Sequence, residues 1–324
     1  MIVLQFVPWI EITKQYGAGV CLGQRGGESE GGGFPDGSVL VGFQQGYLMG
    51  DGIERLTHVK RWLVITSTLG DSRFLNAAVS SVSVLGGEVC HRIISPELRR
   101  KEIMQIAPHA DWMEDEGKGL YHALALVSHD TADYVGVTWL NDDDLLDRNG
   151  ARAAWRILEN DVDRSTIAYG LVDLIDAYDH GQGWLSVCRK GRDMPALLSR
   201  GVVPLAQPGT WIYGALWSRL DGVRPDFRLA GDLDFFVRAS QDAGEFEYVL
   251  QRMARFRLRA GQLSKDVANV REEKDRALKG LSPRLALAAR IRCGMGNPGV
   301  YIDRLRRHGQ ISMERLYQRG GPPK

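Results

Sequence analysis

The sequence is poor in the features that mark several large classes of protein. It has only four cysteines in 324 residues, and none forms a CxxC pair: Cys21, Cys90, Cys188 and Cys293. This spacing argues against a zinc site and a disulfide scaffold and favours reduced thiols in a cytoplasmic protein. No apolar run approaches the roughly 20 residues that span a bilayer. The apolar N-terminus, residues 1–10, lacks the basic segment and cleavage site of a signal peptide.

The sequence also lacks net charge, with 41 basic and 40 acidic side chains and a total of +1. A chain of this balance does not coat nucleic acid, and we expect no nucleic-acid partner. The total hides an asymmetry, because residues 252–324 carry 18 basic and 6 acidic side chains, against 23 and 34 in residues 1–251. An apolar content of 44% is enough for a buried core and excludes wholesale disorder.

Glycine, in contrast, is abundant and unevenly placed. Residues 17–37 hold nine of the 38 glycines, which predicts a flexible loop. We therefore divide the chain into a glycine-rich N-terminal extension (1–60), a central domain (61–261) and a basic, helical C-terminal region (262–324).

The central domain alternates short β-branched runs with segments of helical periodicity. This pattern predicts βαβ units and a mostly parallel sheet flanked by helices. The expected strands are 62–67, 89–94, 134–140, 166–175, 184–187 and a segment near Trp211. The expected helices are 74–82, 96–106, 120–127, 151–158 and 232–243. Residues 114–119 are expected to form an acidic loop.

The sharpest chemical feature is the run Asn141-Asp142-Asp143-Asp144, directly after the strand expected at 134–140. Carboxylates at the carboxyl edge of a parallel sheet lie where such sheets bind ligands. Their mutual repulsion and hard oxygen atoms suit Mg²⁺ or Mn²⁺, which in turn bridges a diphosphate. The alternative is a solvated acidic turn that caps the next helix.

Two further segments carry candidate groups. Asp232 and Asp234 flank an apolar segment, where partial burial makes a carboxylate a better general base; the alternative is a helix N-cap. Lys118 lies between glycines at a helix start, where it can reach a phosphate; the alternative is an ordinary charged loop.

Taken together and in order, these segments resemble the family-2 glycosyltransferases of GT-A fold, particularly bacterial enzymes that build surface polysaccharides. The resemblance covers roughly residues 62–265. It rests on six short segments: VITS at 64–67, EDEGKGLYHA at 114–123, YVGVTWLNDDD at 134–144, YGLVDLID at 169–176, QPGTW at 207–211 and AGDLDFFVR at 230–238.

The resemblance implies a role for each candidate residue. Asp143 would be the main metal ligand of a DXD-like element, supported by Asp142 and Asp144, with Mn²⁺ or Mg²⁺ as the cofactor. Asp232 would be the general base of an inverting transfer from a nucleotide-diphosphate sugar (UDP-, GDP- or dTDP-linked) to a hydroxyl of a carbohydrate or lipid-linked acceptor. The remaining residues would line the donor or acceptor site: Thr66, Asp115, Lys118, Asn141, Gln207, Trp211 and Asp234.

The sequence departs from the family pattern in two places. The acidic turn that usually follows the second strand and holds the nucleotide base reads Ser95-Pro96-Glu97 here. The helix that usually reads Y-D-A-x-N is Tyr121-His122-Ala123-Leu124-Ala125 here. His122 therefore replaces the aspartate and Ala125 replaces the asparagine.

Two interpretations therefore stay open. One is the glycosyltransferase, peripheral on the inner face of the membrane through the arginines at 252–259, at the end of the central domain, and at 304–319, in the C-terminal region. The other is a degenerate transferase fold that acts as a non-catalytic binding or scaffold protein. For the arginines themselves, a solvated helical face is the alternative to a lipid-binding one.

Overall fold

The computed structural model describes residues 10–11, 61–185, 187–203, 205–242, 244–259 and 267–281. The strands within these ranges are β1 (Ile10–Glu11), β2 (Trp62–Ser67), β3 (Val89–Ser95), β4 (Asp111–Glu114), β5 (Gly136–Trp139), β6 (Leu145–Leu146), β7 (Thr166–Ile175), β8 (Gly181–Leu185), β9 (Trp211–Tyr213) and β10 (Glu245–Arg257). The α-helices are α1 (Leu75–Ser83), α2 (Arg100–Ile106), α3 (Leu120–Ala125), α4 (Arg148–Glu159), α5 (Met194–Leu198), α6 (Gly214–Arg219), α7 (Gly231–Gln241) and α8 (Val267–Ala277).

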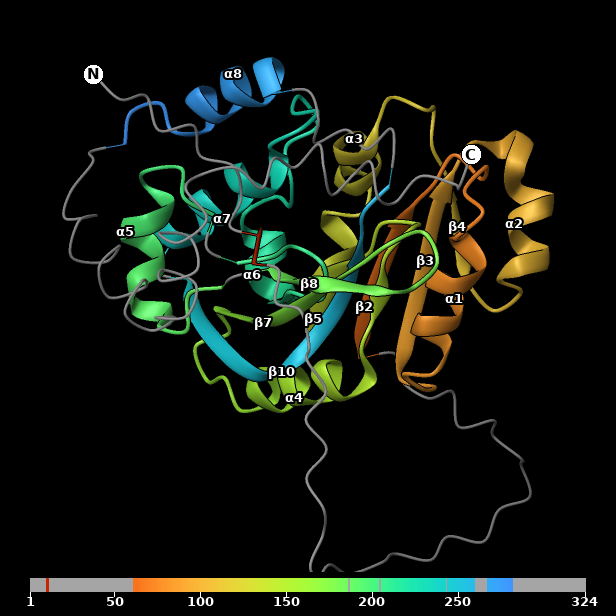
Figure 1. Ribbon diagram of the computed structural model, residues 1–324, viewed down its shortest axis with the longest axis horizontal. Coiled ribbons are helices and arrows are strands. Elements are labelled where there is room, and N and C mark those ends of the chain that lie inside the picture. The colour runs from red at the N-terminus through yellow and green to blue at the C-terminus, as the bar shows by residue number, and fades with distance from the viewer. Residues whose placement is uncertain are drawn as a thin grey trace, which may run out of the picture. The chain divides into compact units, whose positions relative to one another are not determined.

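The strands form one mixed sheet with helices on both faces (Figure 1). Strands β4, β3, β2 and β5 are neighbours in that order and run parallel. Strand β9 pairs antiparallel with both β5 and β7, so β5 and β7 point the same way. Strand β10 is parallel to β7. The carboxyl ends of β2, β5, β7 and β10 therefore all lie at the same edge of the sheet.

Strand β2 shows why the sheet is covered on both faces. Its residues from Trp62 to Thr66 are all buried, which is typical of a central parallel strand rather than of one with a solvated face. Leu63 and Ile65 contribute to the core formed with α3, α6 and α7. Trp62 and Val64 contribute to the core formed with α1 and α4. Alternate side chains thus anchor two different helical layers.

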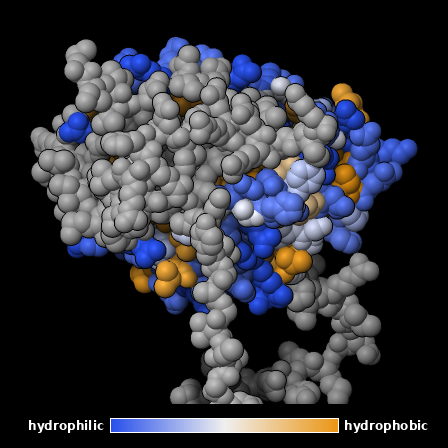
Figure 2. Space-filling view, viewed as in Figure 1, coloured by the Kyte–Doolittle hydropathy of each residue, from blue (hydrophilic) through white to orange (hydrophobic). Residues whose placement is uncertain are grey.

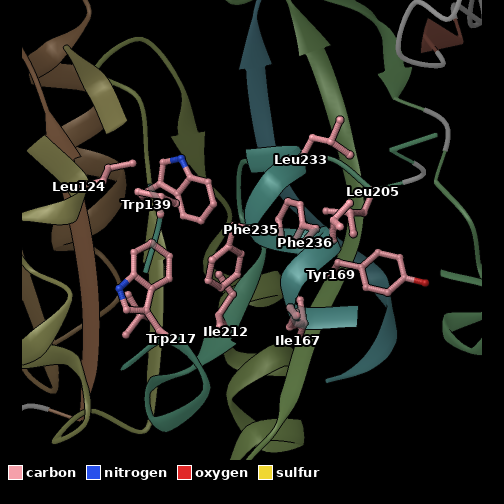
Figure 3. Packing of buried hydrophobic residues seen from close by; sticks show 14 of the residues in the cluster. Leu124, Trp139, Ile167, Tyr169, Leu205, Ile212, Trp217, Leu233, Phe235 and Phe236 are labelled. Atoms are coloured by element: carbon pink, nitrogen blue, oxygen red, sulfur yellow. The ribbon is translucent and has the colours of Figure 1, made fainter. Parts of the chain in front are cut away.

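The core on the α7 side is built around aromatic rings (Figure 3). The ring of Trp139, at the end of β5, makes an edge contact with Trp217 of α6 at 5.5 Å and stacks near Phe236 of α7 at 6.3 Å. Phe235 lies 5.0 Å from Trp217. Because these side chains are almost fully buried, they fix the start of α7 relative to the end of β5.

The core on the other face contains a second aromatic group. Trp62 of β2 stacks on Trp155 of α4 with ring centroids 4.7 Å apart and planes 7° from parallel. Trp211 of β9 meets both rings edge-on, at 5.9 Å from Trp62 and 5.5 Å from Trp155. Helix α4 is itself capped by the Asp147 side chain, which accepts hydrogen bonds from the backbone N–H groups of Asn149 and Gly150.

Most elements agree closely with the periodicity of the sequence, and the expectation of an α/β fold with a mostly parallel sheet is confirmed. Strands β2 and β7 have the expected bounds, and the segment expected to be helical at 96–106 begins with a 3-10 turn before α2. Two strands were not predicted. Residues 111–114 form β4 at the sheet edge, which ends at the first residue of the expected acidic loop, and residues 245–257 form β10.

The described part of the surface in Figure 2 is mostly hydrophilic, with apolar residues in small separate groups. Among the described residues, no helix is long and apolar enough to cross a membrane. Strand β1, in the expected N-terminal extension, pairs with β8. Helix α8, in the expected C-terminal region, packs against α7. The glycine-rich segment 17–37 and the arginines at 304–319 lie outside the described residues.

We expect the Trp211→Ala substitution to lower the free energy of unfolding by about 3–5 kcal/mol, because it removes a fully buried indole from the three-ring group. Denaturant titration measures this loss. The control is Val162→Ala at a side chain that is 91% exposed, with an expected change within about 0.5 kcal/mol. Equal stability of the two variants would show that Trp211 does not hold the α4 layer to the sheet.

Candidate functional site

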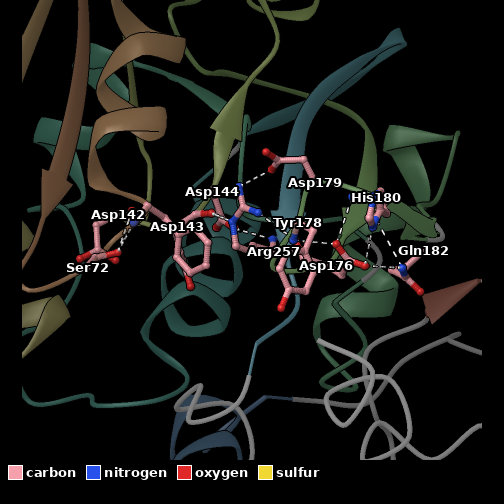
Figure 4. Close-up of polar contacts among 11 residues, drawn as sticks. Ser72, Asp142, Asp143, Asp144, Asp176, Tyr178, Asp179, His180, Gln182 and Arg257 are labelled. Atoms are coloured by element: carbon pink, nitrogen blue, oxygen red, sulfur yellow. Dashed lines mark hydrogen bonds and ion pairs between the residues drawn. The ribbon is translucent and has the colours of Figure 1, made fainter. Parts of the chain in front are cut away.

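The candidate site lies at the edge where the carboxyl ends of β2, β5, β7 and β10 meet (Figure 4). Strand β5 ends at Trp139, and the next residues turn back across the ends of the neighbouring strands. The Leu140 N–H still donates to the Ile65 carbonyl of β2, at 2.9 Å. The acidic run 141–144 therefore begins directly at the strand end, as expected from the sequence.

Asp142 faces the end of β2. Its Oδ2 accepts a 2.6 Å hydrogen bond from the Thr68 hydroxyl, and its carbonyl oxygen accepts one from the Ser72 hydroxyl at 3.3 Å. Burial raises the pKa of the Asp142 carboxyl, and the negative charge of Asp143 raises it further, although the Thr68 hydrogen bond opposes the rise. The arrangement places an excess of negative charge at this point.

Asp143 and Asp144 are buried and have different partners. The Asp143 carboxylate forms an ion pair with the Arg259 guanidinium. Asp144 accepts hydrogen bonds from the Asn141 amide at 3.0 Å and from the backbone N–H of Arg257 at 2.8 Å. Burial raises the pKa of Asp144 well above its usual range. Both Asp144 oxygens thus stabilise the turn from inside.

Arg257 is the buried cation that ties the strand ends together. Its Nε donates to the Asp143 carbonyl at 2.8 Å, and its Nη1 donates to the Asp176 carbonyl at 2.8 Å. Its Nη2 donates to an Asp179 carboxylate oxygen at 2.6 Å. The guanidinium also lies 4.3 Å from the Phe74 ring centroid, a cation–π contact. The sequence placed Arg257 and Arg259 in a basic tail and missed this role.

Most of the first four arginines of that basic region are engaged within the domain. Arg252 forms ion pairs with Asp147 at 3.0 Å and Asp173 at 2.9 Å, while Arg257 and Arg259 bind the acidic edge. These ion pairs balance much of the positive charge that a lipid surface would need at 252–259. The signal in the sequence was the spacing of 255, 257 and 259, which is the two-residue period of a strand.

Asp232, the residue predicted to act as a general base, is the second residue of α7. Its Oδ1 accepts hydrogen bonds from the backbone N–H of Leu233 at 2.8 Å and from the Tyr121 hydroxyl of α3 at 3.4 Å. Burial raises the pKa of Asp232 above the usual value for a carboxyl group. Burial and the negative charge of Asp232 also raise the pKa of Tyr121, so the phenol stays protonated and donates. The sequence did not single out Tyr121.

Two more predicted residues lie at the same edge of the sheet. The Gln207 amide donates a 2.7 Å hydrogen bond to the Trp139 carbonyl, at the end of β5. The backbone N–H of Asp115 donates to the Ser95 carbonyl at the end of β3, and its carboxylate contacts His122 at 3.3 Å. Lys118 is exposed in the following loop, where it pairs with Glu116.

Three predicted site residues are instead part of the interior. Thr66 is fully buried, and its hydroxyl lies 3.0 Å from Nε2 of His91, a histidine whose pKa burial lowers to about 4. Trp211 belongs to the three-ring group described above. Asp234 is 2% exposed and forms ion pairs with Arg224 at 3.2 Å and Arg238 at 2.8 Å. We therefore leave these residues out of the donor site proposed below.

A divalent cation fits the edge only through a small set of protein ligands. Among the described residues, no group of three or more His, Cys, Asp or Glu side chains is arranged to hold a metal ion. Mg²⁺, however, is commonly bound by one or two carboxylates together with substrate phosphates. The candidates for such a pair are Asp142 and Asp143, each of which has one carboxylate oxygen engaged, whereas both oxygens of Asp144 accept hydrogen bonds. A cation that binds Asp143 would compete with the Arg259 guanidinium, which already pairs with that carboxylate.

A cavity of about 620 Å³ lies elsewhere, among α3, α6 and the second half of α7. Its basic residues are matched by aspartates, since Arg219 pairs with Asp242 and both Arg224 and Arg238 pair with Asp234. None of the predicted site residues lines it. The cavity therefore does not add to the site at the sheet edge.

No protein-family model matches the chain, and no curated protein matches it in sequence. Solved structures do match its fold. A structure of S. aureus TarS residues 1–349 superposes with a TM-score of 0.50 and 12% identity, covering 78% of this chain and 77% of that one. The same TarS fragment in complex with UDP-GlcNAc gives a TM-score of 0.51 and 12% identity, covering 80% and 79%. The chain has a TM-score of 0.51 and 13% identity against a longer TarS structure, of which it spans 44%.

TarS is a GT-A-type family-2 glycosyltransferase. At these identities the match speaks for the fold, and the expected GT-A-like architecture, with its mostly parallel sheet flanked by helices, is the fold that this chain has.

We expect the Arg257→Met substitution to destabilise the protein by about 3 kcal/mol, because it leaves buried carbonyl groups at the ends of β5 and β7 without a donor. The control is Arg255→Met on the same strand, with a change of about 0.5 kcal/mol or less. Urea unfolding compares the two. A stable Arg257→Met protein would contradict the view that this cation ties the strand ends together.

Proposed function

We propose that the protein is a glycosyltransferase that moves a sugar from a nucleotide-diphosphate sugar to an acceptor hydroxyl. The observation that carries the proposal is the presence on one GT-A fold of carboxylates at the sheet edge, Asp142 and Asp143, and of a partly buried carboxylate at the start of α7, Asp232. The UDP-GlcNAc complex of TarS supports a nucleotide-sugar as the donor.

In this mechanism Asp232 accepts the proton of the acceptor hydroxyl as its oxygen bonds to the anomeric carbon. The bond between that carbon and the diphosphate oxygen breaks at the same time, and the nucleoside diphosphate leaves with the electron pair. A single displacement of this kind inverts the anomeric configuration. The raised pKa of Asp232 makes it a stronger base than an exposed carboxylate, and the Tyr121 hydroxyl fixes its orientation.

The proposed cofactor is Mn²⁺ or Mg²⁺, held by Asp143 with help from Asp142. When bound, such an ion acts as a Lewis acid that offsets charge on the diphosphate. Arg259 supplies positive charge at the same carboxylate and is 37% exposed, so it can also reach a phosphate at this edge. Asn141 and Gln207 support the turn and the strand end that carry these groups.

The second candidate is a degenerate transferase fold that binds a partner without catalysis. The specific observation in its favour is the ion pair of Asp143 with Arg259, which already neutralises the carboxylate that a metal ion would use. The two candidates differ in metal-dependent nucleotide binding, since only the enzyme requires it.

For the enzyme, we expect Asp232→Asn to lower the rate of sugar transfer by about 10²–10⁴-fold while donor binding is retained, because the amide cannot accept the hydroxyl proton. In the unchanged protein kcat/KM should fall as the pH drops through the raised pKa of Asp232. Released nucleoside diphosphate, measured across a panel of UDP-, GDP- and dTDP-sugars with acceptor, gives the rates. Asp133→Asn at an exposed aspartate is the matched control. Undiminished transfer by Asp232→Asn would exclude this residue as the base.

For the cofactor, we expect the chain to bind UDP more tightly with Mn²⁺ than with EDTA, and Asp143→Asn to weaken the metal-dependent part by about tenfold, or 1.4 kcal/mol. Isothermal titration calorimetry measures both. The control variant is Asp163→Asn, at an exposed aspartate on the loop after α4. If the affinity of the unchanged protein for UDP is the same with and without Mn²⁺, Arg259 is favoured as the phosphate ligand. If the protein binds no nucleotide, the scaffold protein is favoured.

A further inference from the structure

Helix α8 follows β10 in the chain (Figure 1) and packs against α7, the helix that carries the proposed base. Its Glu273 carboxylate accepts three hydrogen bonds from consecutive backbone N–H groups, those of Arg228 at 2.8 Å, Leu229 at 2.7 Å and Ala230 at 2.8 Å. These residues form the segment that leads directly into α7, where Asp232 is the second residue.

The start of α7 has no side-chain cap, and Glu273 binds the N–H groups that lead into the helix rather than those of its first turn. The N-cap residue of α7 is Ala230, whose side chain has no oxygen to accept a hydrogen bond from the first turn. The carboxylate of Glu273 holds the three N–H groups that precede the first turn, and its negative charge lies near the positive end of the helix. Charge-assisted hydrogen bonds of this length are stronger than neutral ones.

The same helix is attached to the preceding residues at a second point. The Arg276 guanidinium forms an ion pair with Asp226 at 3.2 Å and donates to its carbonyl at 2.9 Å. It also lies over the Phe227 ring, 4.0 Å from the centroid. Residues 226–230 are therefore held against α8 along their whole length.

A small displacement of residues 228–231 would change the position of Asp232 relative to Tyr121, because this segment packs closely against α3. A Cβ atom at position 231 would lie 2.7 Å from the Tyr121 ring, so Gly231 packs directly against that ring. The hydroxyl of the same tyrosine donates to Asp232. The position of the segment 228–231 thus sets the distance between Tyr121 and the carboxylate.

We propose that Glu273 is a positioning residue for Asp232: it binds the backbone before α7 and so fixes the base against Tyr121. This inference rests on the proposed function and extends the site to a helix that the resemblance did not include. Glu273 lies on α8, whose sequence has no strong apolar face and is typical of an ordinary charged helix.

The charged groups around Asp232 make the role measurable. Tyr121 faces it from α3 and Glu273 from α8, while Asp234 on α7 itself is paired with Arg224 and Arg238. Burial raises the pKa of Asp232, and the negative charge of Glu273 adds to the rise. Removing that charge should lower the pKa of Asp232 and move the acidic limb of kcat/KM to lower pH. A purely structural loss would reduce the rate without moving the limb.

The test compares Glu273→Ala and Glu273→Gln in the full chain with Glu272→Gln, at the exposed neighbouring glutamate. We expect kcat to fall about tenfold to a hundredfold in Glu273→Ala, with a smaller loss in Glu273→Gln, because the amide oxygen still accepts hydrogen bonds. Both variants should show the shifted acidic limb, and Glu272→Gln should behave as the unchanged protein. Rates and pH profiles of Glu273→Ala equal to those of Glu272→Gln would overturn the proposal.

A second measurement needs no substrate. Amide hydrogen exchange at residues 228–230 should be about tenfold faster in Glu273→Ala than in Glu272→Gln, with the rest of α7 unchanged. Equal protection would overturn the proposal even if the enzyme is active. If no nucleotide-sugar is consumed by the unchanged protein, the proposed function fails, and the exchange rates still decide whether Glu273 holds this segment.

Discussion

The candidate site depends on one buried cation, Arg257, at the point where three strand ends converge. It satisfies carbonyl groups after β5 and after β7, and its own backbone N–H binds Asp144. Carbonyl groups at the ends of parallel strands have no partner within the sheet, so an interior donor has to serve them. A guanidinium, which presents five N–H groups in fixed directions, can satisfy several at once. The turn that carries the acidic run is held by this group.

The edge of the sheet at Asp142 and Asp143 concentrates negative charge, part of which Arg259 neutralises. Asp142 and Asp143 are adjacent, and the pKa of Asp142 is raised by burial and by its neighbour. Arg259, two residues after the end of β10, provides one compensating charge. Under the proposed function, a nucleotide-sugar would bring two phosphates to this edge, and the balance between the carboxylates, Arg259 and a divalent ion would set how donor binding depends on metal. The proposed base is separate from this balance, because α3, α7 and α8 hold it.

Part of this arrangement was readable in the sequence because it depends on local patterns. The β-branched run of β2 and the long apolar run of β7 predicted their strands, and the alternation with helices predicted the sheet. In a parallel sheet the carboxyl ends lie together, so a run of carboxylates after a strand could be assigned to that edge without a structure. Asp232 was singled out on other grounds, as a carboxylate that flanks an apolar segment at a helix start, and its role as a base stays a prediction.

What the sequence by itself determined was therefore the order of most elements, the α/β class and the place of the acidic run after a strand, which follow from short-range periodicity. Only the tertiary structure decided which residues pair across the sheet. Strand β10 was missed because bulges interrupt its alternation and its arginines resemble a solvated basic segment. Trp211 and Asp234 matched a motif but lie in the interior, and Glu273 matched none but binds the start of α7. Such roles depend on contacts between residues far apart in the chain, such as Asp143 and Arg257, 114 positions apart, for which a linear pattern carries no signal.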